Sequence, residues 1–184
     1  MKNKFPLIFF LGLAIIYLIT CFIGPKDIFK VEHELILDAN IEQLFNKVNN
    51  LEHWNTWNDW LENAKEGELS YSRNLSGKGA QLKFDLDTGE GELEILESER
   101  NKRVKTRTIF KSWTGSVYSE YTFKSVGKNK TQINLKVNNS KSTPFVVRGI
   151  LFLNKSKKSI EKSTYDALKM LEKSTSEKRA MRNF

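Results

Sequence analysis

The feature that most constrains the fold is a run of six short segments between residues 69 and 138 in which apolar and polar side chains alternate. Alternation with a period of two is typical of a β-strand that has one buried face and one solvated face. Turn-forming residues separate the segments by short distances, so consecutive strands are expected to pair in the antiparallel sense. The predicted strands are 69–75, 80–86, 91–97, 103–110, 117–123 and 131–137.

A further strand and several helices flank this run. Val31–Leu37 alternates like a strand, and the apolar residues of 41–51 recur at helical spacing behind Asn40, which can cap a helix. The segment 54–60 suits a short second helix. A helical period returns at about 145, which predicts one long amphipathic helix that continues into the 170s. The order is therefore strand, two short helices, six strands and a long helix.

This order predicts an α+β domain in which a curved antiparallel sheet of about seven strands wraps around a long C-terminal helix. If the sheet curls strongly, one helix cannot fill the space that the sheet encloses. We therefore expect a cavity between sheet and helix, open at the end where the two short helices lie. Such a cavity is a natural site for an apolar ligand.

Three tryptophans, Trp54, Trp57 and Trp60, stand three residues apart in the segment LEHWNTWNDW, residues 51–60. One interpretation is that they clamp the short helices onto the sheet. A second, compatible with the first, is that they form an aromatic wall at the mouth of the cavity. A third is insertion at a membrane interface, where Trp is enriched. We expect packing to be their first role and ligand contact their second.

The strands supply the other candidate ligand-binding residues, Phe84, Arg107 and Tyr121. Arg107 belongs to a strand on which basic residues alternate with smaller ones. It lies either on a solvated sheet face or inside, paired with an anionic group of a ligand or with a carboxylate such as Glu120. Together with the three tryptophans, these residues form the predicted site.

An enzyme in the same cavity would need polar groups that converge inside it. No Ser, His and Asp stand in a nucleophile-elbow context, so we assign no catalytic residue. The plausible sources of polar groups are Tyr71, Tyr118, Tyr121, Arg107, His33 and Glu120.

The N-terminal stretch 7–24 carries no charge, and its 18 residues would span roughly 27 Å as a helix, close to the thickness of a bilayer core. A cleaved signal peptide and a lipoprotein signal around Cys21 are alternatives, but neither has a good cleavage pattern. We expect residues 1–25 to form a single-pass anchor in the cell membrane. Lys2 and Lys4 favour a cytoplasmic N-terminus, which would place the domain outside the cytoplasm.

Composition limits the remaining chemistry. Cys21 is the only cysteine and the chain has two histidines, so we expect no metal site and no cofactor.

The net charge is +8, and the chain from Asn154 to its end carries nine Lys and Arg against four Asp and Glu. This balance is typical of a solvated helix face and could also orient the domain on anionic lipid. We expect no nucleic-acid partner, because the basic strand lacks interleaved aromatic residues.

The sequence resembles the SRPBCC superfamily of START-like, helix-grip proteins, most of all its polyketide cyclase/dehydrase-type members. The resemblance covers residues 31 to about 173 and rests on the element order with HELILDANIEQLFNKVNNLEHWNTWNDW, GKGA and GEGELEILESE. Asn40 stands where the family often has a proline. We expect a helix-grip domain at 26–173, as the resemblance implies, followed by a basic, flexible tail at 174–184. It also implies a hydrophobic cavity for lipid-like molecules, used for binding in some members and for catalysis in others.

Three functions are therefore open. The favoured one is a membrane-tethered module that binds or carries a hydrophobic or lipid-like small molecule. The first alternative is a cyclase-, dehydratase- or hydrolase-like enzyme that uses the same cavity. The second is a protein-interaction module whose core is filled and holds no ligand. The sequence sets no oligomeric state.

Overall fold

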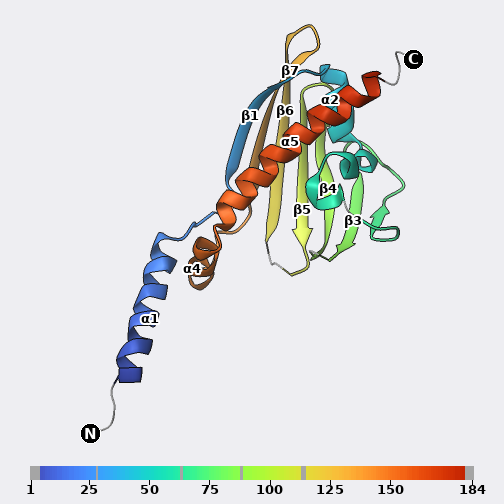
Figure 1. The fold of residues 1–184 in the computed structure, drawn as a ribbon. Helices are drawn as coiled ribbons and strands as arrows, with labels where there is room; N and C mark the ends of the chain where they lie inside the picture. Colours follow the sequence, from blue (N-terminus) through green and yellow to red (C-terminus); the bar gives the residue numbers. More distant parts are fainter. Residues whose placement is uncertain (1–4, 28, 63, 88, 113–114, 181–184) are drawn as a thin grey trace.

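The computed structural model describes residues 5–27, 29–62, 64–87, 89–112 and 115–180. Seven strands form one antiparallel sheet in the order β1-β7-β6-β5-β4-β3-β2, as Figure 1 shows. The predicted sheet is therefore confirmed. The strands are β1 (Val31–Leu37), β2 (Leu69–Tyr71), β3 (Gln81–Leu86), β4 (Gly89–Glu99), β5 (Arg103–Phe110), β6 (Ser116–Gly127) and β7 (Lys130–Asn139).

Strands β2 and β4 depart from the simple alternating pattern on the side of the sheet next to the short helices. β2 ends at Tyr71 and not at 75, because the chain beyond it turns toward the end of the first short helix, where Ser76 forms an isolated bridge with Asn50. The β4–β5 register shifts between Ile95 and Glu97, so Leu96 is an extra residue in β4. Such a bulge bends its strand and increases the local twist of the sheet.

The helices are α1 (Phe5–Ile23), α2 (Ile41–Asn49), the 3-10 helix η1 (Leu51–Thr56), α3 (Asp59–Glu62), α4 (Phe145–Leu153) and α5 (Ser156–Ala180). The Asn40 side chain accepts a hydrogen bond from the Glu42 N–H and caps α2 as predicted. The prediction of one long helix from about 145 is wrong. Lys155 has a φ of 52° and separates α4 from α5, because this left-handed conformation ends the α-helical path.

Helix α5 lies across one face of the sheet (Figure 1). Its residues Ala167, Leu168 and Leu171 are buried in the main hydrophobic core, together with Leu44 and Val48 of α2. The other core residues come mainly from the inner face of the strands. α5 continues to Ala180, beyond the predicted start of a flexible tail at 174, while residues 181–184 lie outside the described part of the chain. The division into domain and tail stays a prediction.

Helix α1 packs against α4 through its last turns. Thr20 and Cys21 are buried, and a Cβ added to Gly149 of α4 would lie 2.8 Å from the Thr20 hydroxyl and 2.9 Å from the Cys21 sulfur. The Tyr17 hydroxyl donates a hydrogen bond to the Val146 carbonyl. This part of α1 is thus one member of a close-packed helix pair and not a lone apolar helix.

Among the residues that the structure describes, no helix combines the length and the hydropathy needed to cross a bilayer. The predicted membrane anchor at 1–25, and with it the single-pass cell-membrane localisation, is therefore wrong. Lys2 and Lys4, on which the predicted orientation depended, lie outside the described residues.

Candidate ligand-binding cavity

A cavity of about 380 Å³ lies between the inner face of the sheet and α5. A volume of this size falls in the range of small-molecule sites in proteins. No charged side chain is among the described residues that line it. The lining consists of Phe29, Trp54, Asn58, Trp60, Phe84, Gly89, Thr106, Thr108, Phe110, Val117, Ser119, Tyr121, Leu135, Val137, Ser159, Ile160, Ser163, Thr164 and Ala167.

The register of the sheet brings small hydroxyl groups together on the cavity floor. Thr106 of β5 stands opposite Ser119 of β6, and Thr108 stands opposite Val117 in the same ladder. Tyr121 lies two residues beyond Ser119 and so on the same face of β6. Since directly opposed Cβ atoms lie roughly 5 Å apart, these side chains form one continuous polar patch within an otherwise apolar floor.

Two of the tryptophans are held by hydrogen bonds to α2. The Trp54 indole N–H donates to the Val48 carbonyl at 2.9 Å, and the Trp57 indole N–H donates to the Lys47 carbonyl at 3.3 Å. Both carbonyls belong to the last turn of α2, where helical partners are missing. These bonds fix the short segment η1 against α2 and thereby position Trp54 at the cavity wall.

Edge-to-face ring contacts join the aromatic residues of the wall. Trp60 packs against Phe84 with ring centroids 5.0 Å apart, and Phe84 packs against Phe110 at 5.7 Å. Trp54 contacts Tyr121 at a centroid distance of 6.1 Å. Such pairs are worth about 0.5–1.5 kcal/mol beyond the area that they bury, so the wall is built from rings that hold each other in place.

Four of the six predicted site residues line the cavity, namely Trp54, Trp60, Phe84 and Tyr121. Trp57 does not, although it is buried: only 1% of its surface is exposed, and it packs behind Trp54 with ring centroids 4.9 Å apart. Ligand contact by the four lining residues remains a prediction.

Arg107 lies on the outer face of β5, away from the cavity. Of the two placements that the sequence allowed, the inward one is therefore wrong. Thr106 and Thr108 face the cavity, so the residue between them faces outward. Its guanidinium instead donates to the Glu94 carboxylate on the neighbouring strand, with Nη2 and Oε2 2.6 Å apart. Arg107 therefore belongs to the outer surface of the sheet and pairs with Glu94, not with Glu120.

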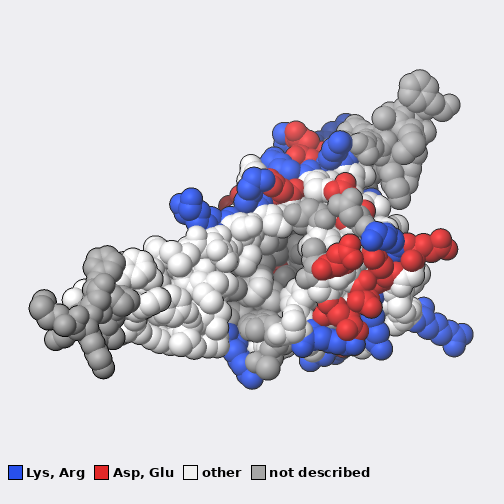
Figure 2. Space-filling view, turned by 60° about the horizontal axis from the view of Figure 1, so that its bottom comes forward, with Lys and Arg blue, Asp and Glu red and all other residues white. Residues whose placement is uncertain are grey.

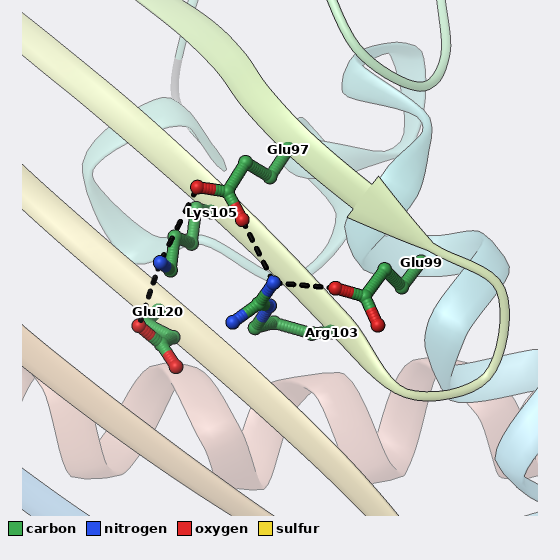
Figure 3. A network of polar contacts seen from close by, with 5 residues as sticks. All are labelled: Glu97, Glu99, Arg103, Lys105 and Glu120. Atoms are coloured by element: carbon green, nitrogen blue, oxygen red, sulfur yellow. Dashed lines mark hydrogen bonds and ion pairs between the residues drawn. The ribbon is translucent and has the colours of Figure 1, made fainter.

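The outer face continues as a network of ion pairs, drawn in Figure 3. Arg103 lies between Glu97, 2.9 Å away, and Glu99, while Lys105 contacts Glu97 at 3.3 Å and Glu120 at 3.5 Å. These charges alternate in sign across neighbouring strands. The basic strand is thus neutralised by its neighbours, which agrees with the interpretation of a solvated sheet face.

Of the six polar groups considered for an enzyme, only Tyr121 lies in the cavity lining. Tyr118 points outward and is 39% exposed, and the His33 Nε2 lies 2.9 Å from the Glu161 carbonyl of α5. Burial raises the pKa of Tyr121 far above its ordinary value, so its hydroxyl stays protonated. A protonated phenol donates a hydrogen bond but does not act as a base.

The mouth of the cavity lies near the start of α5. Ser159 lines the cavity and is exposed to solvent, while the lining residues Phe29, Gly89 and Phe110 are half-buried. Figure 2 looks toward this end of the molecule and shows a hollow between the uncharged helical part and the charged sheet end. The cavity therefore opens at the end where α4 lies in Figure 1. The sequence predicted an opening at the end of the short helices, where α2 lies.

The sequence-based prediction missed the polar part of the lining. Asn58, with 5% of its surface exposed, and the buried Thr106 and Thr108 all line the cavity. Thr106 and Thr108 could have been identified from the sequence, because they lie on the same face of the strand as the apolar Val104. Asn58 has no such signal, since its position depends on the turn between η1 and α3.

No three His, Cys, Asp or Glu side chains gather into a group that could hold a metal ion among the residues the structure describes. No protein-family model matches the sequence, and no curated protein matches it.

Solved structures resemble the chain in fold at low sequence identity. The hypothetical protein jhp0584 of Helicobacter pylori has a TM-score of 0.59 and 14% identity, over 79% of this chain and 86% of that one. DynU16, a putative protein in the dynemicin biosynthetic locus, has a TM-score of 0.54 and 15% identity over 78% of this chain, which spans only 45% of DynU16. Norcoclaurine synthase of Thalictrum flavum has a TM-score of 0.52 and 15% identity, over 73% and 87% of the two chains.

These likenesses agree with the topology described above: seven antiparallel strands, two short helical segments after the first strand, and a long helix across the sheet. At such identities a likeness shows the fold and not the activity. The chain therefore has the fold of these proteins, which agrees with the predicted helix-grip arrangement of sheet and C-terminal helix.

Proposed function

We propose that this domain binds a hydrophobic small molecule in the cavity between the sheet and α5, as a binding or carrier module. The observation that carries the proposal is the cavity itself: about 380 Å³ with a largely aromatic and apolar lining and no charged side chain among the described lining residues. Filling such a space with an apolar ligand removes apolar surface from water, which is favourable at about 25 cal/mol per Å².

The position of the mouth supports the proposal. Exposed Ser159 and half-buried Phe29 and Phe110 give a ligand a way in from solvent, while buried Trp54 and Tyr121 line the interior. Norcoclaurine synthase, which has the same fold, was solved with dopamine and hydroxybenzaldehyde, two small aromatic molecules. A protein of this fold thus holds small aromatic molecules.

Two variants test the proposal. Ala167→Phe places a ring in the cavity from α5, and Ser159→Phe places one at the mouth. Lys158→Phe puts the same ring on the exposed side of α5, outside the lining, and serves as the matched control. Each protein is purified and denatured, and the small molecules that it releases are identified by mass spectrometry.

We expect the wild-type chain and Lys158→Phe to release the same apolar compound at a fixed ratio to protein. Ala167→Phe and Ser159→Phe should release several-fold less of it while keeping the far-UV circular dichroism of the wild type. Equal release from all four proteins would mean that the compound is bound outside the cavity, and the proposal would then fail.

A further inference from the structure

Asn58 is a buried polar residue whose side chain has no partner within the described part of the chain. Its backbone is fully used: the N–H donates to the Trp54 carbonyl at 2.9 Å, and the carbonyl accepts from Leu61 and Glu62. Only 5% of the residue is exposed, and it lines the cavity. Among the described residues, none forms a hydrogen bond with its carboxamide. Buried polar groups in native proteins are nearly always paired with protein or with ordered water, so the carboxamide takes its hydrogen-bond partners from whatever fills the cavity, water or ligand.

The cavity floor carries further hydroxyl groups in the same condition. Thr106 is 1% exposed, Thr108 is 7% exposed and Tyr121 is 5% exposed, and all three line the cavity. Within the described part of the chain, their hydroxyls form no hydrogen bond with another residue. Together with Asn58 they offer donors and acceptors to whatever occupies the space.

The lining also excludes charge. A carboxylate or ammonium group inside the cavity would lose its hydration and find no opposite charge among the described lining residues, which is strongly unfavourable. Arg107, the cation closest in sequence to the cavity-lining threonines, lies on the outer face and is paired with Glu94. The hydrogen-bonding groups are therefore suited to neutral polar atoms and not to ions.

We propose that the cavity selects a neutral, largely apolar ligand with a polar group that both donates and accepts hydrogen bonds, and that Asn58 determines this specificity. An amide, a lactam and an enol with a neighbouring ketone are groups of this kind. The carboxamide of Asn58 matches such a group with one donor and one acceptor. The inference rests on the proposed function, because it concerns the ligand of the same cavity.

Three naphthalene derivatives substituted at the same ring position test this inference. Naphthamide carries a neutral donor–acceptor group, naphthoate is nearly isosteric but anionic at neutral pH, and methylnaphthalene lacks a polar group. Their dissociation constants are measured by isothermal titration calorimetry with the full chain. Asn58→Leu removes the carboxamide at similar volume, and Asn55→Leu, an exposed position on η1 outside the lining, is the matched control.

The wild-type chain and Asn55→Leu should bind naphthamide on the order of tenfold more tightly than methylnaphthalene, and naphthoate most weakly. In Asn58→Leu the preference between naphthamide and methylnaphthalene should disappear or reverse, because the amide would then be buried without a partner. Circular dichroism and the melting temperature of each variant establish that it is folded.

The two proposals fail in different ways. Binding of all three probes with similar affinity, or an unchanged preference in a folded Asn58→Leu protein, overturns the role of Asn58 and leaves the proposed function standing. Tightest binding of naphthoate overturns the neutrality of the ligand. If none of the probes binds and no compound is released from the purified protein, the proposed function falls and the inference falls with it.

Discussion

The indole nitrogen of Trp54 donates a hydrogen bond to the backbone carbonyl of Val48, 2.9 Å away, at the end of helix α2. Trp57 does the same for the carbonyl of Lys47. A helix leaves its last four carbonyls without helical partners, and here two of them are satisfied by side chains that follow in sequence. The Trp segment is thus a C-terminal cap for α2 as well as a wall of the cavity.

Trp57→Phe tests this capping role. The substitution leaves the Lys47 carbonyl without its donor in a buried setting and opens a small void, since Trp57 is only 1% exposed. We expect the free energy of unfolding in urea to fall by about 2–4 kcal/mol. Trp60→Phe is the comparison, because Trp60 is half-buried and packs against Phe84, while its indole donates no hydrogen bond to any residue that the structure describes. Equal losses in the two variants would contradict a capping role.

The parts of the fold that were predictable from the sequence are those set by local pattern. The alternation of Leu82, Phe84 and Leu86 identified β3 because a period of two on a half-buried strand needs no knowledge of its neighbours. Asn40 was identified as a cap for a similar reason, since its side chain bonds to an N–H two residues away.

The parts that were missed depend on the third dimension. Lys155 breaks the C-terminal helix although neither Gly nor Pro marks the position. The β4 bulge at Leu96 is set by the pairing of whole strands. The inner face of β5 was predictable in principle from Val104, but the polarity of Thr106 and Thr108 hid its continuation. The direction in which the cavity opens depends on how α4 and α5 meet the sheet, which no local pattern records.

Gly91→Ala tests how closely the aromatic wall is packed. A Cβ at this position would lie 2.2 Å from the Ile109 carbonyl oxygen and 2.6 Å from the Phe84 ring. Because the clash involves backbone, we expect a loss of about 1–3 kcal/mol in unfolding free energy and a displaced Phe84 ring. Urea unfolding and the ring proton shifts of Phe84 measure the two effects. Gly127→Ala, whose Cβ would find its nearest atom at 3.7 Å, should leave both unchanged.

The ion pair between Asp38 and Lys130 gives the protein a defined pH dependence. The two side chains meet at 2.6 Å, and the Lys130 hydrogen bond, followed by its charge, lowers the pKa of Asp38 below its ordinary value of 3.8. The same contact raises the pKa of Lys130 above 10.5. The pair therefore contributes fully between these two ordinary values. Its contribution is lost as the pH falls through the lowered pKa of Asp38 or rises through the raised pKa of Lys130.

Titration of the Asp38 carboxyl by NMR measures this effect. The midpoint should lie below 3.8 in the wild-type chain and return toward that value in Lys130→Met. Lys128→Met, on the same hairpin, is the control and should not move it. An unchanged Asp38 midpoint in Lys130→Met would show that the contact does not persist in solution.

Arg107→Gln separates the outer face of the sheet from the cavity. The Arg107–Glu94 pair is partly exposed, with side-chain exposures of 35% and 21%, so its loss should cost no more than about 1 kcal/mol. Because Arg107 does not line the cavity, the dissociation constant of naphthamide should stay within about twofold of the wild-type value. A large loss of naphthamide affinity without unfolding would place Arg107 back in the binding site.

Lys155→Gly tests the break between α4 and α5. A φ of 52° is strained for a side chain with a Cβ and is free of strain for glycine. Glycine also gains freedom in the unfolded chain, which offsets part of the relief, so we expect the free energy of unfolding to rise by about 0.5–1 kcal/mol. Lys155→Ala keeps the strain and removes only the exposed side chain, so its stability should match that of the wild type. If glycine lowers stability relative to alanine, the two helices are continuous in solution and the break at Lys155 is absent.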